Sequence, residues 1–595
     1  STLKVAALNM NGRGHDNPVN LDGKWHRLFD LIRDKRIDIL ALNETHLDDA
    51  GVAAIHERFG KRLALFNSPN PDNPCAREGV TVVMNKERTN VLDARVNVLV
   101  PGRAVMVTTA WHGNLTFTYL AIYAPNNRKE NEKFWDVLYS KILTDDTLPI
   151  PDAMGGDTNL VEDPMDALPM RREHLGALRA FDRLVNTLQL IDGWRDHNKG
   201  RIGYTHRQSA TGTQSRIDRI YASREAMSTS QNWDIETPNF KTDHKLVSME
   251  ITNPAAPHVG RGRATWPKHL IAGDKILNDE VKKKGLNFQS ALTELNTGRR
   301  TRTDADNPQT LFKSFKDDIF LVCRERARVV VPRMKKEIDE LKLRIRQVEN
   351  DALLDEEEKL LSLAVLQEKL ETLEIRRYEK IKTSARARNK LEGETPSKYW
   401  SNLAKGRAPR DTIARLRIPD TYPARFTTRS KDMAGIARKH HDELQRKFEF
   451  ALTNEDHTKA IEYALAAADA RIAEDDKAEM DAPFTEEEVR GAVRTAPQGK
   501  AAGINGIPAE LWQELDRRYK ADEAAERPAF NVVRCMAVVY NDIHEFGVAD
   551  GSEFEQGWMC PLYKKKDRSD IVNYRPITLL NTDYKIFTKC LALRL

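Results

Sequence analysis

"LKVAALNM", residues 3–10, is an apolar run that ends in polar residues, and four further runs resemble it. They are "IDILALNE" (37–44), "GVTVVMN" (79–85), "AVMVTTAW" (104–111) and "LTFTYLAIYAP" (115–125). Their β-branched residues and flanking turn formers predict β-strands. Several are almost wholly apolar, as in sheets covered on both faces. Helical patterns lie between strands, at Lys24–Arg36, Asn131–Leu143 and Glu173–Leu190. Residues 1–252 are therefore predicted to form an α/β sandwich.

The composition changes after this region. The segment "TNPAAPHVGRGRATWPKH" (252–269) is rich in Pro, Gly and Arg and has no periodicity, which indicates a linker at 253–273. Residues 274–400 are predicted to be a helical, coiled-coil region and residues 401–483 a helical connector. Residues 484–595 form the last predicted region, where Thr485 and Glu488 have the spacing of a capping box.

Within the helical region, two sets of apolar residues share a 3-4-3 spacing, namely Ile338, Leu341, Ile345, Val348 and Leu363, Leu366, Leu370, Leu373. The segment "ENDALLDEEE" (349–358) breaks the register between them, so a helical hairpin and one long coil both fit. We favour a solvated spacer over a nucleic-acid contact, although "RRYEKIKTSARARNK" (376–390) concentrates positive charge.

Bulk properties narrow the class of protein. A chain of 595 residues is too long for one core, and 40% hydrophobic with 31% charged residues is ordinary for a globular protein. No run approaches the length of a membrane span, and the first residues lack a secretory pattern. Five scattered cysteines without a C-x-x-C pair predict reduced thiols in an intracellular protein. The net charge of +5 suits a nucleic-acid partner.

Polar residues suited to phosphoester chemistry follow the predicted strands. They occur in "ALNMNG" (Asn9, Asn11), "ILALNETHL" (Glu44), "IYAPN" (Tyr123, Asn126), "AMGGDTN" (Asp157, Asn159), "SRIDRIY" (Asp218) and "TDHK" (Asp243, His244). Mg²⁺ prefers hard oxygen ligands and needs few of them from the protein. A histidine paired with a buried aspartate suits proton transfer or charge stabilisation. Each fragment alone also fits a turn, a cap or a solvated strand end, but their ordered combination favours one metal-assisted phosphodiesterase site.

This ordered set resembles the endonuclease/exonuclease/phosphatase superfamily, and specifically the apurinic-endonuclease-like domain of non-LTR (LINE-type) retrotransposons. The motifs are "LNMNG", "NETHL", "IYAPN", "GDTN", "IDRI" and "TDH", across residues 1–250. The resemblance implies a four-layer α/β sandwich that nicks double-stranded DNA with Mg²⁺, for which Mn²⁺ is a substitute. It further implies an intracellular protein that acts in the nucleus.

The resemblance also implies roles for individual residues. Glu44 would be the principal metal ligand, with Asn11 or Asp243 as helpers. Asp157 would activate the attacking water, and Asn9 and Asn159 would hold that water, Asp157 or the phosphate. His244, oriented by Asp218, would contact the phosphate. The expected phosphate or DNA contacts are Tyr123, Asn126, Thr205, Arg207 and Arg216, the last two flanking the loop "RQSATGTQSR" (207–216), which also fits a simple flexible hairpin.

The chain departs from the family pattern at four positions. Asn43 stands where Gln commonly precedes the metal-binding Glu, and Thr158 replaces a frequent aromatic. Asn11 stands where repair relatives often carry Asp, which leaves the second metal ligand open. His206 follows Thr205 in place of the usual aromatic. None of these changes removes a group that the chemistry needs.

The last region resembles the opening of a retroelement reverse transcriptase. The motifs are "GINGIP" (503–508), "YRPI" (574–577) and "LLNTDYKI" (579–586). The resemblance implies a partial fingers region in which Lys564, Lys565 and Arg575 meet nucleic acid or nucleotide phosphates, and the alternative is that they are plain surface cations. The metal-binding carboxylates of the polymerase palm are absent from the sequence, so polymerase activity is not expected.

The sequence thus predicts a Mg²⁺-dependent DNA-nicking endonuclease from a retrotransposon protein. Two alternatives stay open: an abasic-site repair nuclease, and a truncated product that only binds nucleic acid. Expected partners are target DNA and the element's RNA, with self-association through the helical hairpin or the apolar last helix, and no membrane.

Overall fold

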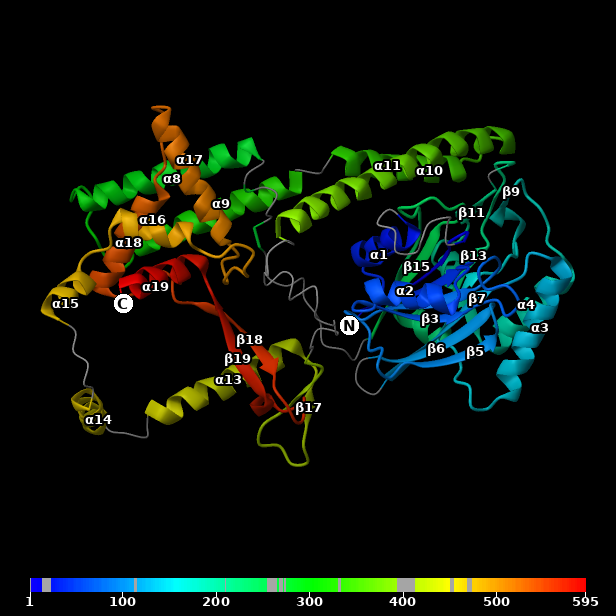
Figure 1. Ribbon diagram of the computed structural model, residues 1–595, viewed down its shortest axis with the longest axis horizontal. Helices are drawn as coiled ribbons and strands as arrows, with labels where there is room; N and C mark the ends of the chain where they lie inside the picture. Colours follow the sequence, from blue (N-terminus) through cyan, green and yellow to red (C-terminus); the bar gives the residue numbers. More distant parts are fainter. Residues whose placement is uncertain are drawn as a thin grey trace. The chain divides into compact units, whose positions relative to one another are not determined.

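The structure is a computed structural model that describes residues 2–12, 23–111, 115–208, 210–253, 265–266, 271, 274–329, 333–392, 413–449, 454–467 and 473–594. Of residues 329, 333–334, 378–392, 447–449, 454, 475–476 and 479 only the backbone is described. The chain forms two compact units. The first comprises Ser1–His258 and Pro332–Ala414, and the second comprises Val259–Val331 and Arg415–Leu595. Each unit is described by itself below (Figure 1).

Two six-stranded sheets form the centre of the first unit. One has the order β14-β15-β1-β2-β4-β3 and the other the order β10-β13-β8-β7-β6-β5. The strands are β1 (Thr2–Asn9), β2 (Ile39–Asn43), β3 (Leu63–Ser68), β4 (Val80–Asn85), β5 (Arg95–Val100), β6 (Ala104–Trp111), β7 (Leu115–Tyr123), β8 (Ala153–Asp157), β10 (Leu190–Asp192), β13 (Asp218–Ser223), β14 (Ser230–Glu236) and β15 (Leu246–Thr252). A small third sheet contains β9 (Ala167–Leu168), β11 (His206–Arg207) and β12 (Gln214–Ser215).

The two sheets pack face to face, and helices cover their outer faces. Val5 of β1 and Tyr119 of β7 belong to one buried cluster between the sheets. The outer helices are α1 (Lys24–Lys35), α2 (Asp49–Phe59), α3 (Arg128–Thr144) and α4 (Leu175–Thr187). Two short helices, α5 (Gly193–His197) and α6 (Arg224–Thr229), contact strands of both sheets. Trp25 of α1 packs on the first sheet, and Trp135 of α3 packs on the second. The predicted α/β sandwich is thereby confirmed. Its physical reason is that strands which are apolar on both faces need a cover on each side.

The strand register gathers the polar strand ends at one edge. β1 runs parallel to β2, so Asn9 pairs with Asn43. β7 runs parallel to β8, so Tyr123 pairs with Asp157. β13 runs antiparallel to β8, which sets the first residue of β13, Asp218, opposite Asp157.

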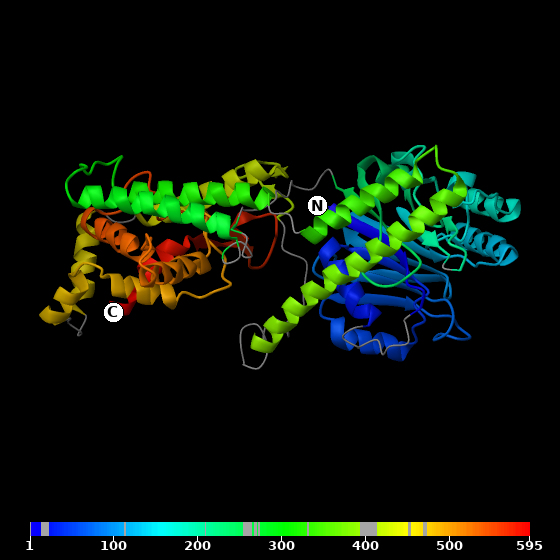
Figure 2. The same ribbon diagram turned by 90° about the horizontal axis from the view of Figure 1, so that it is seen from above.

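Helices α10 (Arg333–Glu349) and α11 (Glu356–Glu392) belong to the first unit and form a hairpin. Ile338, Ile345, Leu363 and Leu370 form most of its buried core, together with Leu168 and Tyr204 of the sandwich. Figure 1 and Figure 2 both draw the hairpin along one side of the sandwich. The alternative of one long coil is thereby excluded. The predicted region 274–400 is divided between the two units, because its first two helices pack elsewhere.

The second unit is mainly helical. Its helices are α8 (Lys275–Asn296), α9 (Pro308–Val329), α13 (Ser430–Glu449), α14 (Asn454–Ala466), α15 (Glu474–Asp481), α16 (Glu486–Arg494), α17 (Ala509–Ala524), α18 (Val532–Phe546) and α19 (Thr582–Arg594). Helices α8, α9 and α16 to α19 share a core that contains Phe312 and Trp512. Thr485 and Glu488 form the predicted capping box. Two hairpins complete the unit, β16 (Leu416–Arg417) with β17 (Phe426–Thr427) and β18 (Gly557–Tyr563) with β19 (Tyr574–Leu580).

Some sequence predictions fall outside the described residues, including most of the 253–273 linker and residues 401–412. In the part of the chain that the structure describes, no helix combines the length and the hydrophobicity that a membrane crossing requires.

Candidate active site

Asn9 links two carboxylates at the edge where the strands end. Its Nδ2 donates hydrogen bonds to Glu44 Oε1 at 2.9 Å and to Asp157 Oδ2 at 3.0 Å. Its Oδ1 accepts from the backbone N–H of Asn11. Asn9 is fully buried, so this geometry is set by the core and not by solvent. One amide thus holds the expected metal ligand and the expected catalytic base side by side.

Glu44 is fixed from a second side by Tyr123. The Tyr123 hydroxyl donates to Glu44 Oε1 at 2.8 Å, and the guanidinium of Arg103 lies 4.9 Å from the centre of the Tyr123 ring. Burial, followed by the charges of Glu44 and Asp157, raises the pKa of Tyr123 well above its usual value. Tyr123 is therefore a neutral hydrogen-bond donor at physiological pH.

Asp157 ends β8 and is almost wholly buried. Its Oδ1 accepts from the backbone N–H of Asn159 at 2.9 Å. Burial, with the nearby charge of Asp218, raises the pKa of Asp157 to about 6, while His244 and Asn9 oppose the rise. A carboxylate with this pKa is ionised at neutral pH yet can accept a proton.

Asp218 and His244 form a buried pair. His244 Nδ1 lies 2.9 Å from Asp218 Oδ2. Burial alone would lower the pKa of His244, but the charge and hydrogen bond of Asp218, then Asp157 and Asp243, raise it to about 10. The ring is therefore an imidazolium at neutral pH. Among the described residues, Asp218 Oδ1 has no hydrogen-bond partner although it is buried.

Thr205 supports this pair from behind. It is fully buried, and its Oγ1 accepts from the backbone N–H groups of Ile217 at 3.1 Å and Asp218 at 3.0 Å. The expected contact between Thr205 and phosphate is corrected, because its hydroxyl is occupied in orienting the segment that carries Asp218.

Arg216 is likewise not at the surface. Its guanidinium is buried and pairs with Asp166, through Nε at 2.9 Å and Nη2 at 2.8 Å, and with Asp192 at 2.7 Å. Arg219 joins the same cluster. The expected DNA contact of Arg216 is corrected, because two carboxylates inside the domain already satisfy its charge.

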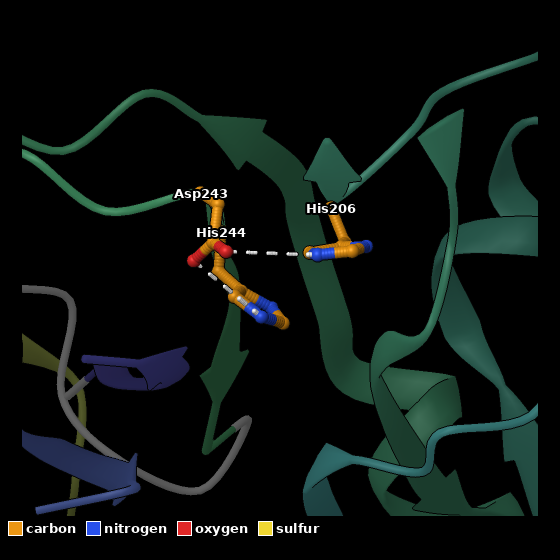
Figure 3. A group of neighbouring side chains, drawn as sticks. All are labelled: His206, Asp243 and His244. Atoms are coloured by element: carbon orange, nitrogen blue, oxygen red, sulfur yellow. Dashed lines mark ion pairs between the residues drawn. The ribbon is translucent and has the colours of Figure 1, made fainter. Parts of the chain in front are cut away.

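Asp243 lies beside His206 and His244 in Figure 3, and it also contacts Asn11. Its Oδ2 is 3.8 Å from His206 Nε2, its Oδ1 is 3.9 Å from His244 Nε2, and Asn11 Nδ2 donates to Oδ1 at 2.9 Å. The His206 and His244 rings lie with centroids 4.6 Å apart. Burial would raise the pKa of Asp243, but His206, His244 and Asn11 hold it at about 2. His206 entered the sequence analysis only as a departure from the family pattern, and its membership of the site was missed.

Lys24, at the start of α1, is a second residue that sequence reasoning missed. Its Nζ donates to the carbonyls of Met10, Asn11 and Gly12 at 2.7, 3.0 and 3.1 Å. Burial lowers the pKa of Lys24, against the attraction of Asp243 and Glu44. The charges of Asp243 and Glu44 thus act on Lys24, although burial outweighs them.

The chemistry of the donors fits a hard divalent cation. Glu44, Asn11 and Asp243 offer carboxylate and amide oxygens, which Mg²⁺ and Mn²⁺ accept. Two further groups, His206–Asp243–His244 and Asp157–Asp218–His244, have ligand atoms within 4.8 Å of one another. The fully buried Asn43 braces the same edge, since its Nδ2 donates to the Ile122 carbonyl at 2.8 Å and its Oδ1 accepts from the Asp157 N–H at 3.2 Å.

The remaining predicted residues lie outside this cluster. Asn126 is exposed beyond the end of β7. Arg207 lies on β11 beside His206, and its backbone N–H donates to the Asp243 carbonyl. Lys564, Lys565 and Arg575 are exposed in the second unit, at or near the β18–β19 hairpin.

Comparisons with known proteins find similarity over the sandwich and over the whole chain. Residues 6–244 match the model of the Endonuclease/Exonuclease/phosphatase family. The whole chain is 26% identical to the Transposon TX1 uncharacterized 149 kDa protein of Xenopus laevis, and it spans 42% of the length of that curated relative. Residues 6–244 are therefore similar to the endonuclease/exonuclease/phosphatase family, within a chain that is similar to a transposon protein.

Solved structures with similarity to the chain include two nucleases. An AP endonuclease from Archaeoglobus fulgidus is 18% identical, with 42% of this chain and 100% of that chain covered and a TM-score of 0.34. The endonuclease domain of TRAS1, a telomere-specific non-LTR retrotransposon, is 13% identical, with 42% and 99% covered and a TM-score of 0.32.

Proposed function

We propose that this chain nicks DNA by Mg²⁺-dependent phosphodiester hydrolysis, as the endonuclease part of a retrotransposon protein, and leaves a 3′-hydroxyl. The observation that carries the proposal is the pair of hydrogen bonds by which Asn9 joins Glu44 to Asp157, at 2.9 and 3.0 Å. They bring a metal-binding carboxylate and a base with a raised pKa to one edge, next to an imidazolium. The full-length similarity to a transposon protein supports the retroelement context.

Glu44, with Asn11 and Asp243, would hold the metal ion. A bound Mg²⁺ would stabilise the negative charge that develops on the phosphoryl and leaving oxygens. Tyr123 and Asn9 hold Glu44 in one orientation, and partners of this kind typically tune metal affinity and activity.

Asp157 acts on the attacking water. Its two oxygens accept from Asn9 and Asn159, which fixes the plane of the carboxylate. With a pKa of about 6, it is ionised at neutral pH and takes a proton from water as that water attacks phosphorus. The Asn9 amide and the backbone N–H of Asn159 thus hold Asp157 in one orientation towards that water.

His244 contributes charge and not basicity. Asp218 keeps its ring protonated, with a pKa of about 10, so it cannot accept a proton at neutral pH. An imidazolium beside the phosphate stabilises the pentacovalent phosphorus, in which negative charge grows on the non-bridging oxygens. Tyr123, which stays a neutral phenol, donates a hydrogen bond in the same region.

The second unit is proposed to contain a partial reverse-transcriptase fingers region, at 484–595. Its β18–β19 hairpin exposes Arg575, and Lys564 and Lys565 follow β18 in the connecting turn, where they could meet phosphates. We expect it to bind nucleic acid or nucleotide without polymerising.

A supercoiled-plasmid assay tests the main proposal. The 595-residue chain is incubated with plasmid and Mg²⁺, and wild type is compared with Glu44→Ala and His244→Ala. We expect open-circular product from wild type, loss of this product with EDTA, and a decrease of about 10²-fold or more in each variant. Variants that nick as fast as wild type would show that the site is assigned wrongly.

A further inference from the structure

Three cations flank the candidate site. Arg207 follows His206 on β11, Lys241 lies two residues before Asp243, and Lys245 follows His244. Lys241 is exposed, and Arg207 and Lys245 are half-buried. In the described part of the chain, the buried Arg207 Nε donates to no acceptor. These three cations therefore lie on the two segments that carry His206, Asp243 and His244, and cations of this kind attract a phosphate backbone.

Acidic residues of the α10–α11 hairpin face these cations. Glu349, at the end of α10, lies with its Oε1 3.5 Å from Lys245 Nζ, and it is 4% exposed. Burial raises the pKa of Glu371 of α11, and the charges of Lys241 and Arg207 oppose that rise. The hairpin thus sets one carboxylate against Lys245 and another against Lys241 and Arg207.

The hairpin has a core of its own and is docked mainly by polar contacts. Most of its apolar cluster lies between α10 and α11, and the sandwich adds only Leu168, Tyr204 and Ile202 to it. The docking contacts are polar or ionic: Asn350 with Ile202 (2.9 Å), Gln367 with Gln214 (3.0 Å), Met170 with Glu356 (3.0 Å), Arg346 with Asp234 (3.7 Å), Lys342 with Glu236 (3.8 Å) and Arg377 with Asp34 (3.2 Å). Separation from the sandwich would leave the contacts between α10 and α11 in place and would uncover only the part of the cluster that Leu168, Tyr204 and Ile202 cover.

We propose that Arg207, Lys241 and Lys245 form a phosphate-binding strip for duplex DNA, and that the α10–α11 hairpin occupies this strip until DNA displaces its acids. The inference rests on the proposed nuclease function and adds a DNA contact surface and its control. DNA phosphates and the carboxylates of Glu349 and Glu371 are alternative anions for the same cations. When DNA phosphates replace these carboxylates, the three cations exchange one anionic partner for another.

Equilibrium binding of the full chain to a fluorescein-labelled DNA duplex tests the proposal. The titrations are made in EDTA, where the duplex is not cut, at several salt concentrations. We expect Lys241→Ala and Lys245→Gln each to weaken binding and to lower the slope of log K against log salt by about 0.9. Binding that is unchanged in both variants would overturn the strip.

The acids are tested by the double variant Glu349→Gln/Glu371→Gln. Loss of both competing charges is expected to tighten binding by about threefold to tenfold. The matched control is Glu357→Gln, an exposed residue of α11 with the same change of charge, which should leave affinity unchanged. If the double variant and this control bind the duplex with equal affinity, the carboxylates of Glu349 and Glu371 do not compete with DNA.

Hydrogen exchange gives a readout of displacement that needs no substitution. Addition of the duplex is expected to speed amide exchange within 350–356, where the hairpin meets Ile202 and Met170, and unchanged or slower exchange there would contradict release. Failure of the proposed nuclease function can be told apart from failure of this inference, because the former appears as the absence of Mg²⁺-dependent nicking. A chain that nicks but shows none of these binding effects refutes only the strip and its cover.

Discussion

The Asp218→Asn substitution separates charge from shape at the buried pair. Asp218 is the main attractive partner of His244, and together with Asp157 and Asp243 it raises the pKa of the ring from 6.5 to about 10 against the effect of burial. This difference corresponds to about 5 kcal/mol in favour of the imidazolium. Asparagine keeps the size of the side chain but removes its charge, so burial should dominate and the pKa of His244 should fall to 6.5 or lower.

The sign of the linked stability follows from the raised pKa. A histidine whose pKa is higher when folded contributes stability that is fully present below pH 6.5 and is lost as the pH rises towards 10. The wild-type free energy of unfolding should therefore decline over this range by up to about 5 kcal/mol. The Asp218→Asn variant should lack this decline, because its His244 titrates as it does when unfolded or at lower pH.

Two assays check the reasoning, the first on the metal-free chain and the second with Mg²⁺. NMR of the His244 ring should show an imidazolium up to about pH 9 in wild type and a neutral ring at pH 8 in Asp218→Asn. Plasmid nicking, measured after Mg²⁺ is added, should fall by about 10²-fold in the variant at pH 8. A His244 pKa that is unchanged by Asp218→Asn would refute the assignment of Asp218 as the source of the charge.

Three further substitutions test neighbouring contacts. Thr205→Val leaves the N–H groups of Ile217 and Asp218 without an acceptor, so urea unfolding should show a loss of stability of about 1–3 kcal/mol per group. Thr205→Ser keeps the hydroxyl and should lose less stability. Equal losses in the two variants would contradict the role of the hydroxyl. Arg216→Met removes one guanidinium from the Asp166–Asp192 cluster, where Arg219 remains. It should therefore cost less than the ~3–5 kcal/mol of a fully unpaired buried charge, without changing the salt slope of DNA binding. A lower slope would return Arg216 to the DNA interface. Tyr123→Phe removes one hydrogen bond to Glu44 and should weaken apparent Mg²⁺ affinity or nicking by about 10- to 100-fold at unchanged stability. A variant with the Mg²⁺ dependence of wild type would refute the role of Tyr123 in orienting Glu44.

The sandwich and the centre of the site were within reach of sequence reasoning. Asn9, Glu44, Tyr123 and Asp157 each end or follow an apolar strand, and the register of neighbouring strands brings such ends to one edge. The pairing of Asp218 with His244 followed from the family resemblance, and the 2.9 Å contact agrees with it.

Other features depend on contacts that no local pattern encodes. Lys24 reaches the site because the first turn of α1 faces three carbonyls, which the helical pattern alone does not reveal. Arg216 was expected at the surface because its loop is polar. It is instead buried, because its guanidinium pairs with Asp166 and Asp192, which are distant in sequence. The apolar periodicity of the α10–α11 hairpin predicted a buried stripe, whereas its docking surface is polar and carries no periodic signal.

The most direct test of the central claim is the chemistry of the nick itself. Plasmid treated with the full chain and Mg²⁺ is offered to a DNA polymerase with labelled nucleotides, since the polymerase extends only a 3′-hydroxyl. The account predicts labelled open-circular plasmid from wild type and about 10²-fold less from Asp157→Asn, which cannot take the proton of the attacking water. Nicks that cannot be extended, or extension at the wild-type level from Asp157→Asn, would contradict hydrolysis at this site.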